Sequence, residues 1–203
     1  MLNNLLRKEV MLCVKKISQE EKCAQSKAVC RKLLSLDEYK SSTKVLSYVS
    51  MNDELSTDEL NEKALEDHKE LYLPRVIQGT SFMEFYKVSA SPVRKNLVSG
   101  NWGILEPSLI KENLFEAEKL SPSDKIFIAV PGVVFSESGG RVGHGKGFYD
   151  IFLSSLALCA KKNNFFFFTC GLAFNEQIRE NLALEPHDYI LDKVIFLNQL
   201  NKQ

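Results

Sequence analysis

Residues Val130 to Asp150 read V-P-G-V-V-F-S-E-S-G-G-R-V-G-H-G-K-G-F-Y-D, and the rest of the chain is organised around this stretch. An apolar run of β-type residues, Lys125 to Val130, leads into it and predicts a buried strand. After Asp150, apolar residues recur at helical spacing, which predicts a helix to about Lys162. The stretch is therefore the glycine-rich connection between a strand and a helix.

The composition of this loop is typical of a phosphate site. Five glycines, which let the backbone approach an anion closely, surround Arg141, His144 and Lys146. Backbone N–H groups and the start of a helix attract anions, and Asp150 could hold the magnesium that accompanies a nucleotide. The loop matches neither G-x-x-x-x-G-K-[ST] nor G-x-G-x-x-G. The alternative is a long turn that only joins the strand to the helix.

Bulk properties limit the class of protein. A chain of 203 residues is long enough for one well-buried domain, and we expect a single α/β domain over residues 1–203. Its 26 basic and 26 acidic residues balance, so no global field favours nucleic acid, and no apolar run is long enough to span a membrane. The five cysteines form no C-x-x-C pair, which fits reduced thiols in a cytoplasmic protein.

Two helices are predicted at the N-terminus. Residues 2–16 carry apolar side chains at helical spacing. Ser18 and Glu21 have the spacing of a capping box that opens a second helix, which runs to about Leu34. We expect the two helices to form a helical hairpin packed on the domain.

The remaining pattern alternates strands and helices. Strands are predicted at 44–50, 70–76, 81–88, 125–130, 165–172 and 189–197, with helices after most of them. This order indicates a doubly wound, mostly parallel sheet with helices on both faces. Ligands of such sheets bind at the carboxyl ends of the strands. We therefore expect Glu54, Arg75, the loop after Pro131 and the region of Phe174 to converge on one site.

The central motif, P-G-V-V-F-x-x-x-G-G-R-V-G-H-G-K-G-F-Y-D, strongly resembles the signature of the 5-formyltetrahydrofolate cyclo-ligase family. M-N-D-E-L around Glu54, L-P-R-V, W-G-I-L-E-P, G-L-A-F-N-E-Q and P-H-D follow the order of that family, so the likeness covers nearly the whole chain. It implies a sheet related to sugar-phosphate isomerases and CoA-transferases. It also implies ATP- and Mg²⁺-dependent cyclisation of 5-formyltetrahydrofolate to 5,10-methenyltetrahydrofolate through a phosphorylated formyl oxygen, with release of ADP and phosphate.

The resemblance also assigns roles to residues. It implies catalytic roles for Lys146, Arg141 and His144, and metal ligation by Asp150 and Asp188. The implied ATP-binding residues are Asn3, Arg7, Arg141, Val142, Gly143, His144, Gly145, Lys146, Gly147, Phe148 and Tyr149. The implied folate-binding residues are Val49, Glu54, Trp102, His144, Gly145, Lys146, Gly147 and Phe148. As partners we expect only these small molecules, with no nucleic acid and no membrane, and we expect a monomer.

Several alternatives stay open at this stage. Asp188 could instead cap its own turn, with Asp192 as a rival metal ligand. Trp102 could plug the core rather than stack on a flat ligand. Many family members carry Lys at the position of Asn3 and Arg at that of His144, so phosphate binding could depend on pH. The competing functions are a non-catalytic sensor of sugar phosphates on the same fold and a related enzyme with another formyl or carboxyl substrate.

Overall fold

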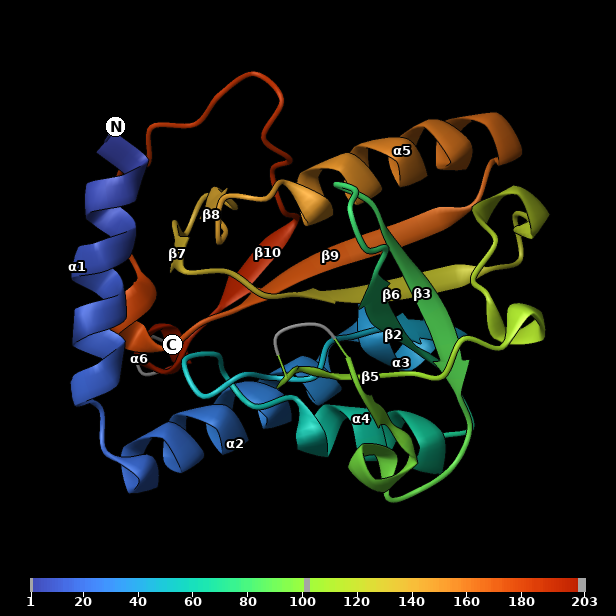
Figure 1. Ribbon diagram of the computed structural model, residues 1–203, viewed down its shortest axis with the longest axis horizontal. Coiled ribbons are helices and arrows are strands. Elements are labelled where there is room, and N and C mark those ends of the chain that lie inside the picture. Colours follow the sequence, from blue (N-terminus) through green and yellow to red (C-terminus); the bar gives the residue numbers. More distant parts are fainter. Residues whose placement is uncertain (1, 101–102, 201–203) are drawn as a thin grey trace.

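The main sheet is mixed but mostly parallel (Figure 1). The structure is a computed structural model that describes residues 2–100 and 103–200. Six strands lie in the order β10-β9-β6-β1-β2-β3, and every neighbouring pair is parallel except β2 and β3. Their bounds are β1 Lys44–Leu46, β2 Glu70–Val76, β3 Met83–Val88, β6 Lys125–Val130, β9 Phe166–Leu172 and β10 Lys193–Ile195.

Helices cover both faces of this sheet. They are α1 Leu2–Lys16, α2 Gln19–Ser35, α3 Asp37–Ser41, α4 Asp58–Glu66, α5 Phe148–Asn163 and α6 Leu197–Leu200. Successive residues of β1 belong to different cores: Val45 packs in one cluster with Leu33 and Leu60, and Leu46 packs in another with Leu153. Alternation of this kind means that both faces are buried. The predicted doubly wound, mostly parallel α/β sheet is confirmed.

Shorter elements complete the chain. Two small antiparallel pairs join β4 Val98–Ser99 to β5 Leu105–Glu106 and β7 Val134–Phe135 to β8 Arg141–Val142. Single 3₁₀ turns are η1 Val93–Asn96, η3 Lys111–Asn113, η4 Ala117–Lys119 and η5 Asn175–Gln177. The second pair shows that the glycine-rich loop is itself a hairpin before it enters α5.

The two N-terminal helices are present, but their packing as a hairpin is not confirmed. Ser18 caps α2 as predicted, because its hydroxyl accepts a hydrogen bond from the Glu21 N–H at 3.1 Å. Helix α1 packs against β7 and η5, whereas α2 packs against α3, α4, β10 and α6. Figure 1 shows the two helices running in clearly different directions after their short connection. Helix α1 therefore lies against the glycine-rich loop.

Two predicted strands are shorter than expected, and the residues released from them form loops. The strand predicted at 44–50 ends at Leu46, because the Tyr48 carbonyl accepts from Thr57 Oγ1 at 2.5 Å and Asn61 Nδ2 at 3.1 Å rather than from a strand. The strand predicted at 189–197 is reduced to Lys193–Ile195. Because β1 ends at Leu46, the segment that carries Glu54 forms a loop.

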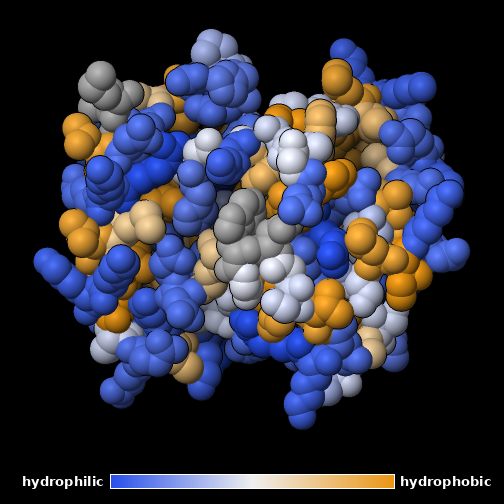
Figure 2. Space-filling view, viewed as in Figure 1, coloured by the Kyte–Doolittle hydropathy of each residue, from blue (hydrophilic) through white to orange (hydrophobic). Residues whose placement is uncertain are grey.

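Surface hydrophobic residues are dispersed. On the face shown in Figure 2, apolar side chains lie among hydrophilic ones, and the large exposed examples sit on separate elements, such as Leu12 on α1 and Leu158 on α5. Among the described residues, no helix combines the length and the apolar character that crossing a bilayer requires.

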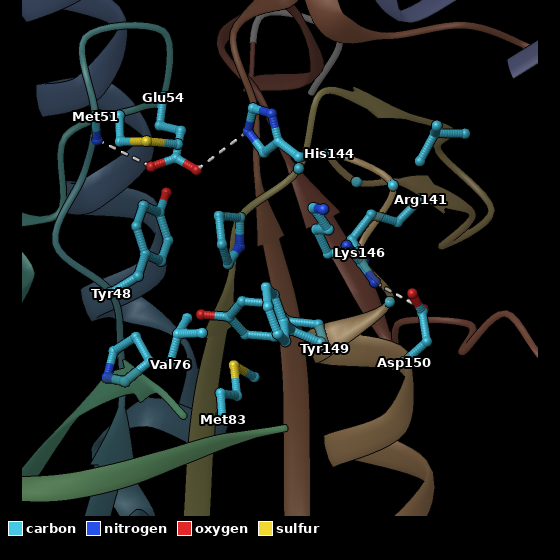
Figure 3. Close-up of a pocket in the computed structure, with 18 of the residues that line it drawn as sticks. Tyr48, Met51, Glu54, Val76, Met83, Arg141, His144, Lys146, Tyr149 and Asp150 are labelled. Atoms are coloured by element: carbon cyan, nitrogen blue, oxygen red, sulfur yellow. Dashed lines mark hydrogen bonds and ion pairs between the residues drawn. The ribbon is translucent and has the colours of Figure 1, made fainter. Parts of the chain in front are cut away.

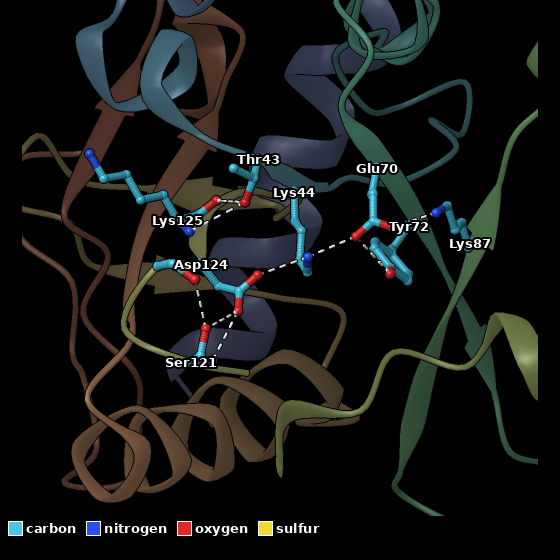
Figure 4. Close-up of polar contacts among 9 residues, drawn as sticks. Thr43, Lys44, Glu70, Tyr72, Lys87, Ser121, Asp124 and Lys125 are labelled. Atoms are coloured by element: carbon cyan, nitrogen blue, oxygen red, sulfur yellow. Dashed lines mark hydrogen bonds and ion pairs between the residues drawn. The ribbon is translucent and has the colours of Figure 1, made fainter. Parts of the chain in front are cut away.

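The amino ends of β1, β2 and β6 are joined by charge pairs (Figure 4). Lys44 Nζ lies 2.7 Å from Glu70 Oε2 and 2.9 Å from Asp124 Oδ1, and Lys87 also pairs with Glu70. Partial burial acts to raise the pKa of the Glu70 and Asp124 carboxyl groups, but it is outweighed by Lys44 and Lys87 at Glu70 and by Lys44 and the hydrogen bonds from Ser121 at Asp124, so both pKa values are lowered. The charged side chains of Lys44, Glu70, Lys87 and Asp124 at this edge of the sheet are therefore paired with one another.

Replacing Lys44 by Met should lower the free energy of unfolding at pH 7 by about 1–2 kcal/mol, because two partly buried carboxylates lose a shared cation. Since the carboxyl pKa values are lowered on folding, this contribution is present above pH about 4 and is lost as the pH falls through the lowered values. Urea unfolding across pH 3 to 8 measures it. The matched control is Lys40→Met, whose pair with Asp37 is exposed; an equal loss in both variants would contradict the prediction.

Candidate active site

A pocket of about 680 Å³ opens at the carboxyl ends of the parallel strands. Segments that follow β1 and β6, the end of β2 and the start of β3 contribute to its wall, together with α1 and the start of α5. The lining includes Asn3, Arg7, Val49, Glu54, Arg141, Val142, Gly143, His144, Gly145, Lys146, Gly147, Phe148, Tyr149, Asp150 and Asp188. The structure thus brings these candidate residues to one cavity, while their individual roles stay predictions.

Not every expected residue reaches the cavity. Arg75 points to Glu106 and the Pro107 carbonyl and does not line the pocket, and Phe174 is buried in a core cluster. Trp102, with its two possible roles, lies outside the described residues. The rule that ligands bind at the carboxyl ends of parallel strands therefore located the pocket, but it did not predict which side chains line it.

The glycine-rich loop needs glycine at specific positions. Gly139 has φ +92°, and a Cβ there would lie 2.1 Å from the Leu191 carbonyl oxygen. Gly145 and Gly147 have φ values of +91° and +71°, a conformation that other residues rarely adopt. Gly147 is also the residue at which α5 begins to wind. Gly145 and Gly147 thus flank Lys146, so the loop needs glycine on both sides of this lysine.

A buried ion pair closes the loop onto α5. Arg141 Nη2 donates to Asp150 Oδ1 at 2.7 Å, and the Arg141 side chain is only 3% exposed (Figure 3). The same carboxylate oxygen accepts from the Tyr189 N–H at 3.3 Å. Because the buried guanidinium and the partly buried carboxylate each need a partner, the pair fixes β8 relative to the first turn of the helix.

Helix α1 holds the other side of the loop. Arg7 Nε donates to the Gly143 carbonyl at 2.6 Å, and the Arg7 guanidinium lies beside Gly145. Asn3 Nδ2 donates to the Ala183 carbonyl at 3.2 Å. Both side chains line the pocket, so an N-terminal helix that is distant in sequence forms part of the same wall.

Lys146 differs from the two arginines. Among the described residues, no hydrogen bond or ion pair is formed by its ammonium group, although the residue lines the pocket. Figure 3 shows its side chain between His144 and Arg141. An unpaired ammonium in such a place is free to neutralise an anion, which agrees with the predicted contact to phosphate.

Glu54 and His144 approach each other from two separate loops. His144 Nε2 lies 3.9 Å from Glu54 Oε1, and Glu54 Oε2 accepts from the Met51 N–H at 2.9 Å (Figure 3). The Glu54 carboxylate raises the pKa of His144 above its ordinary value, although partial burial and the Arg7 guanidinium oppose this and Asp53 adds to it. The imidazole therefore carries a positive charge over a wider pH range than an isolated histidine.

Apolar and aromatic side chains form another part of the pocket wall. Val49 is 7% exposed, and Phe148 and Tyr149 are partly buried against the second core cluster, so both aromatic residues line the pocket and also pack inward. Tyr48 and Met83 extend the wall (Figure 3). A cavity with one cationic and one apolar side suits a ligand that has a flat ring and a second ligand that has phosphates.

The three candidate metal ligands are in different situations. Asp150 Oδ1 is engaged by Arg141 and Tyr189, Asp188 Oδ2 accepts from the Glu185 N–H at 2.7 Å, and both residues line the pocket. Asp192 instead accepts from the N–H and hydroxyl of Thr169 and does not line it. Each of the first two keeps a second carboxylate oxygen without a hydrogen bond from the described residues.

This donor set fits Mg²⁺ only in a shared form. The described residues contain no cluster of three His, Cys, Asp or Glu side chains that could hold a metal. Mg²⁺ is commonly bound by one or two carboxylates together with waters and substrate phosphates. Asp150 and Asp188 supply two such carboxylates at the pocket wall, so the residues present are compatible with a nucleotide-borne ion.

Sequence reasoning missed other lining residues, notably Glu106, Tyr48 and Met83. Glu106 is 3% exposed and lies 3.6 Å from Arg75 Nε through its Oε2 atom. Its signal was available, because W-G-I-L-E-P places an acidic residue four positions after the tryptophan and directly ahead of a proline. Tyr48 and Met83 look like ordinary strand residues in the sequence, and only the sheet order brings them to the cavity.

Comparison with known proteins supports one family. The model of the 5-formyltetrahydrofolate cyclo-ligase family matches residues 2–197. A protein of Caenorhabditis elegans named "Probable 5-formyltetrahydrofolate cyclo-ligase" is 35% identical over 94% of this chain and 90% of its own length. The 5-formyltetrahydrofolate cyclo-ligase of Mus musculus is 28% identical over 94% and 91%.

A solved structure agrees with this. The 5,10-methenyltetrahydrofolate synthetase of Aquifex aeolicus superposes with a TM-score of 0.73 at 34% identity and covers 96% of this chain and 89% of its own. Sequence and fold both extend over the strands, the pocket and the glycine-rich loop. The chain belongs to the 5-formyltetrahydrofolate cyclo-ligase family of ligases.

Proposed function

We propose that this protein converts 5-formyltetrahydrofolate to 5,10-methenyltetrahydrofolate with consumption of ATP. One observation carries the proposal beyond family membership: the Lys146 ammonium, which is unpaired among the described residues, lines a cavity that is also lined by apolar side chains such as Val49 and Met83. The cationic side suits a triphosphate and the apolar side suits a reduced pterin ring. The γ-phosphoryl group and the folate would then meet in the same cavity.

The proposed reaction has two steps. The formyl oxygen attacks the γ-phosphorus, the bond to ADP breaks, and the formyl group becomes an activated iminium phosphate. The N10 amine then attacks the formyl carbon, phosphate leaves with the former formyl oxygen, and N10 loses its proton to give the methenyl ring. Phosphoryl transfer requires mainly positioning and charge neutralisation, which are the properties that Lys146 and the loop amides supply.

The remaining side chains position the reactants. Arg141, locked to Asp150, keeps the loop in shape, and Arg7 adds positive charge from α1. Glu54 is proposed to accept hydrogen bonds from the folate, next to the His144 imidazolium. Mg²⁺, held by Asp150 and Asp188, would neutralise the charge of the nucleotide phosphates. The Asn3 and His144 departures from the family pattern affect affinity for the nucleotide in this scheme.

The first test mixes the protein with 5-formyltetrahydrofolate, Mg²⁺ and ATP and follows methenyl absorbance in the near ultraviolet. The wild type should form product, and Lys146→Ala should lower turnover by about 100- to 1,000-fold, the usual effect of removing one preorganised charge-stabilising group. Lys161→Ala on the exposed surface of α5 is the matched control and should be unaffected. A folded wild type without product, or without ATP consumption, would exclude the proposed function.

The pH dependence of ATP binding follows from His144. Because its pKa is raised by Glu54, the imidazole is protonated below that pKa and loses its charge as the pH rises through it. The KM for ATP should therefore increase as the pH rises above the ordinary pKa of histidine, about 6.5, and through the raised value. His144→Arg should give a flat and low KM, and His144→Gln a flat and high one. A wild-type profile that matches His144→Arg throughout would contradict this assignment.

The metal assignment can be tested without disturbing the turn. In Asp188→Asn, the side-chain carbonyl can still accept from the Glu185 N–H, but the charge is lost. The Mg²⁺ concentration for half-maximal activity should rise by about tenfold, as the loss of one carboxylate ligand implies. Asp192→Asn is the control and should affect stability rather than Mg²⁺ dependence. The reverse pattern would make Asp192 the ligand.

A further inference from the structure

Two tyrosines of the pocket differ in how their hydroxyl groups are satisfied. The Tyr48 hydroxyl donates to the Leu55 carbonyl at 3.0 Å. The Tyr149 hydroxyl is buried and has no hydrogen-bond partner among the described residues. A buried, unpaired hydroxyl reduces the stability of the fold, so substitution of the tyrosine by phenylalanine should increase that stability. Its presence at the wall of a binding cavity needs an explanation.

The ring of Tyr149 is held in place. Phe85 contacts it edge to face with ring centroids 6.4 Å apart, and the Arg141 guanidinium lies over the ring, 5.7 Å from its centroid. Figure 3 shows the hydroxyl pointing toward the wall formed by Val76 and Tyr48, away from Lys146 and Asp150. The hydroxyl is thus directed to the apolar side of the pocket and not to the phosphate side.

The chemistry of this group limits what it can bind. A tyrosine phenol ordinarily titrates at about pH 10, well above neutral pH. The phenol therefore keeps its proton and acts as a hydrogen-bond donor. A neutral donor among apolar side chains matches a neutral carbonyl oxygen better than a phosphate oxygen, which would select the cationic side of the cavity.

We propose that the Tyr149 hydroxyl donates a hydrogen bond to a carbonyl oxygen of the reduced folate and so determines specificity for that substrate. The assignment rests on the proposed function. It moves Tyr149 from the nucleotide-binding set, in which the sequence resemblance placed it, to the folate side. The unpaired donor of the free protein then becomes paired only when the folate is bound.

The test compares Tyr149→Phe with Tyr39→Phe, which also removes a tyrosine hydroxyl but lies outside the pocket and has a partner, Asp67 Oδ2 at 3.0 Å. Binding of 5-formyltetrahydrofolate without ATP, binding of a non-hydrolysable ATP analogue, and urea unfolding are measured for each. Tyr149→Phe should weaken folate binding by about tenfold, leave binding of the analogue unchanged, and unfold at the same or a higher urea concentration. Tyr39→Phe should unfold at a lower concentration with unchanged binding of both ligands.

Three results would overturn the proposal: unchanged folate affinity in Tyr149→Phe, a loss confined to the ATP analogue, or a loss of stability like that of Tyr39→Phe. Turnover of the wild type separates this failure from failure of the function. If the wild type forms methenyl product while Tyr149→Phe binds folate normally, only the role of Tyr149 is wrong. If the wild type binds folate and Tyr149→Phe weakens this binding, but no product forms, the role of Tyr149 is supported and the proposed reaction is excluded.

Discussion

The ion pair between Arg141 and Asp150 is the constraint on which the site depends. The Arg141 side chain is almost completely buried. The positions next to it have little room for a side chain larger than that of glycine: a Cβ on Gly143 would lie 2.7 Å from Arg141 Nη1, and one on Gly132 would lie 3.0 Å from Arg141 Cγ. Burying two charges carries a desolvation cost that their attraction does not always exceed. Such a pair is better explained by the geometry it imposes, because it joins a two-stranded hairpin to the first turn of α5.

That constraint separates the roles of the cations around the loop. Arg141 is committed to Asp150, and Arg7 is committed in part to the Gly143 carbonyl, whereas Lys146 has no such commitment among the described residues. A cation that is already paired has less to offer an incoming phosphate than one that is free. The arginines therefore act mainly on the shape of the loop, and the lysine is the group best placed to respond to a ligand.

Local sequence patterns predicted the main strands and helices, but they did not predict contacts between residues that are distant in the sequence. The apolar run 125–130 and the helical spacing after Asp150 predicted β6 and α5, and the strand order rule placed the pocket at the carboxyl edge. The approach of His144 to Glu54 could not be found in this way, because it depends on how two loops, 90 residues apart in sequence, leave adjacent strands. The burial of Glu106 beside Arg75 likewise depends on a small strand pair that has no periodic signal.

The two edges of the sheet show how stability and function are divided. At the amino edge, Lys44 is matched by two carboxylates. At the carboxyl edge, of the six buried side-chain atoms without a hydrogen-bond partner in the described part of the chain, four belong to residues that line the pocket, namely Asn3, Glu106, Arg141 and Tyr149, although Glu106 Oε2 also forms an ion pair with Arg75. Folding alone would favour the removal of such atoms. Their concentration around one cavity indicates that polar groups there are kept for ligands, since binding can satisfy what the fold leaves unpaired.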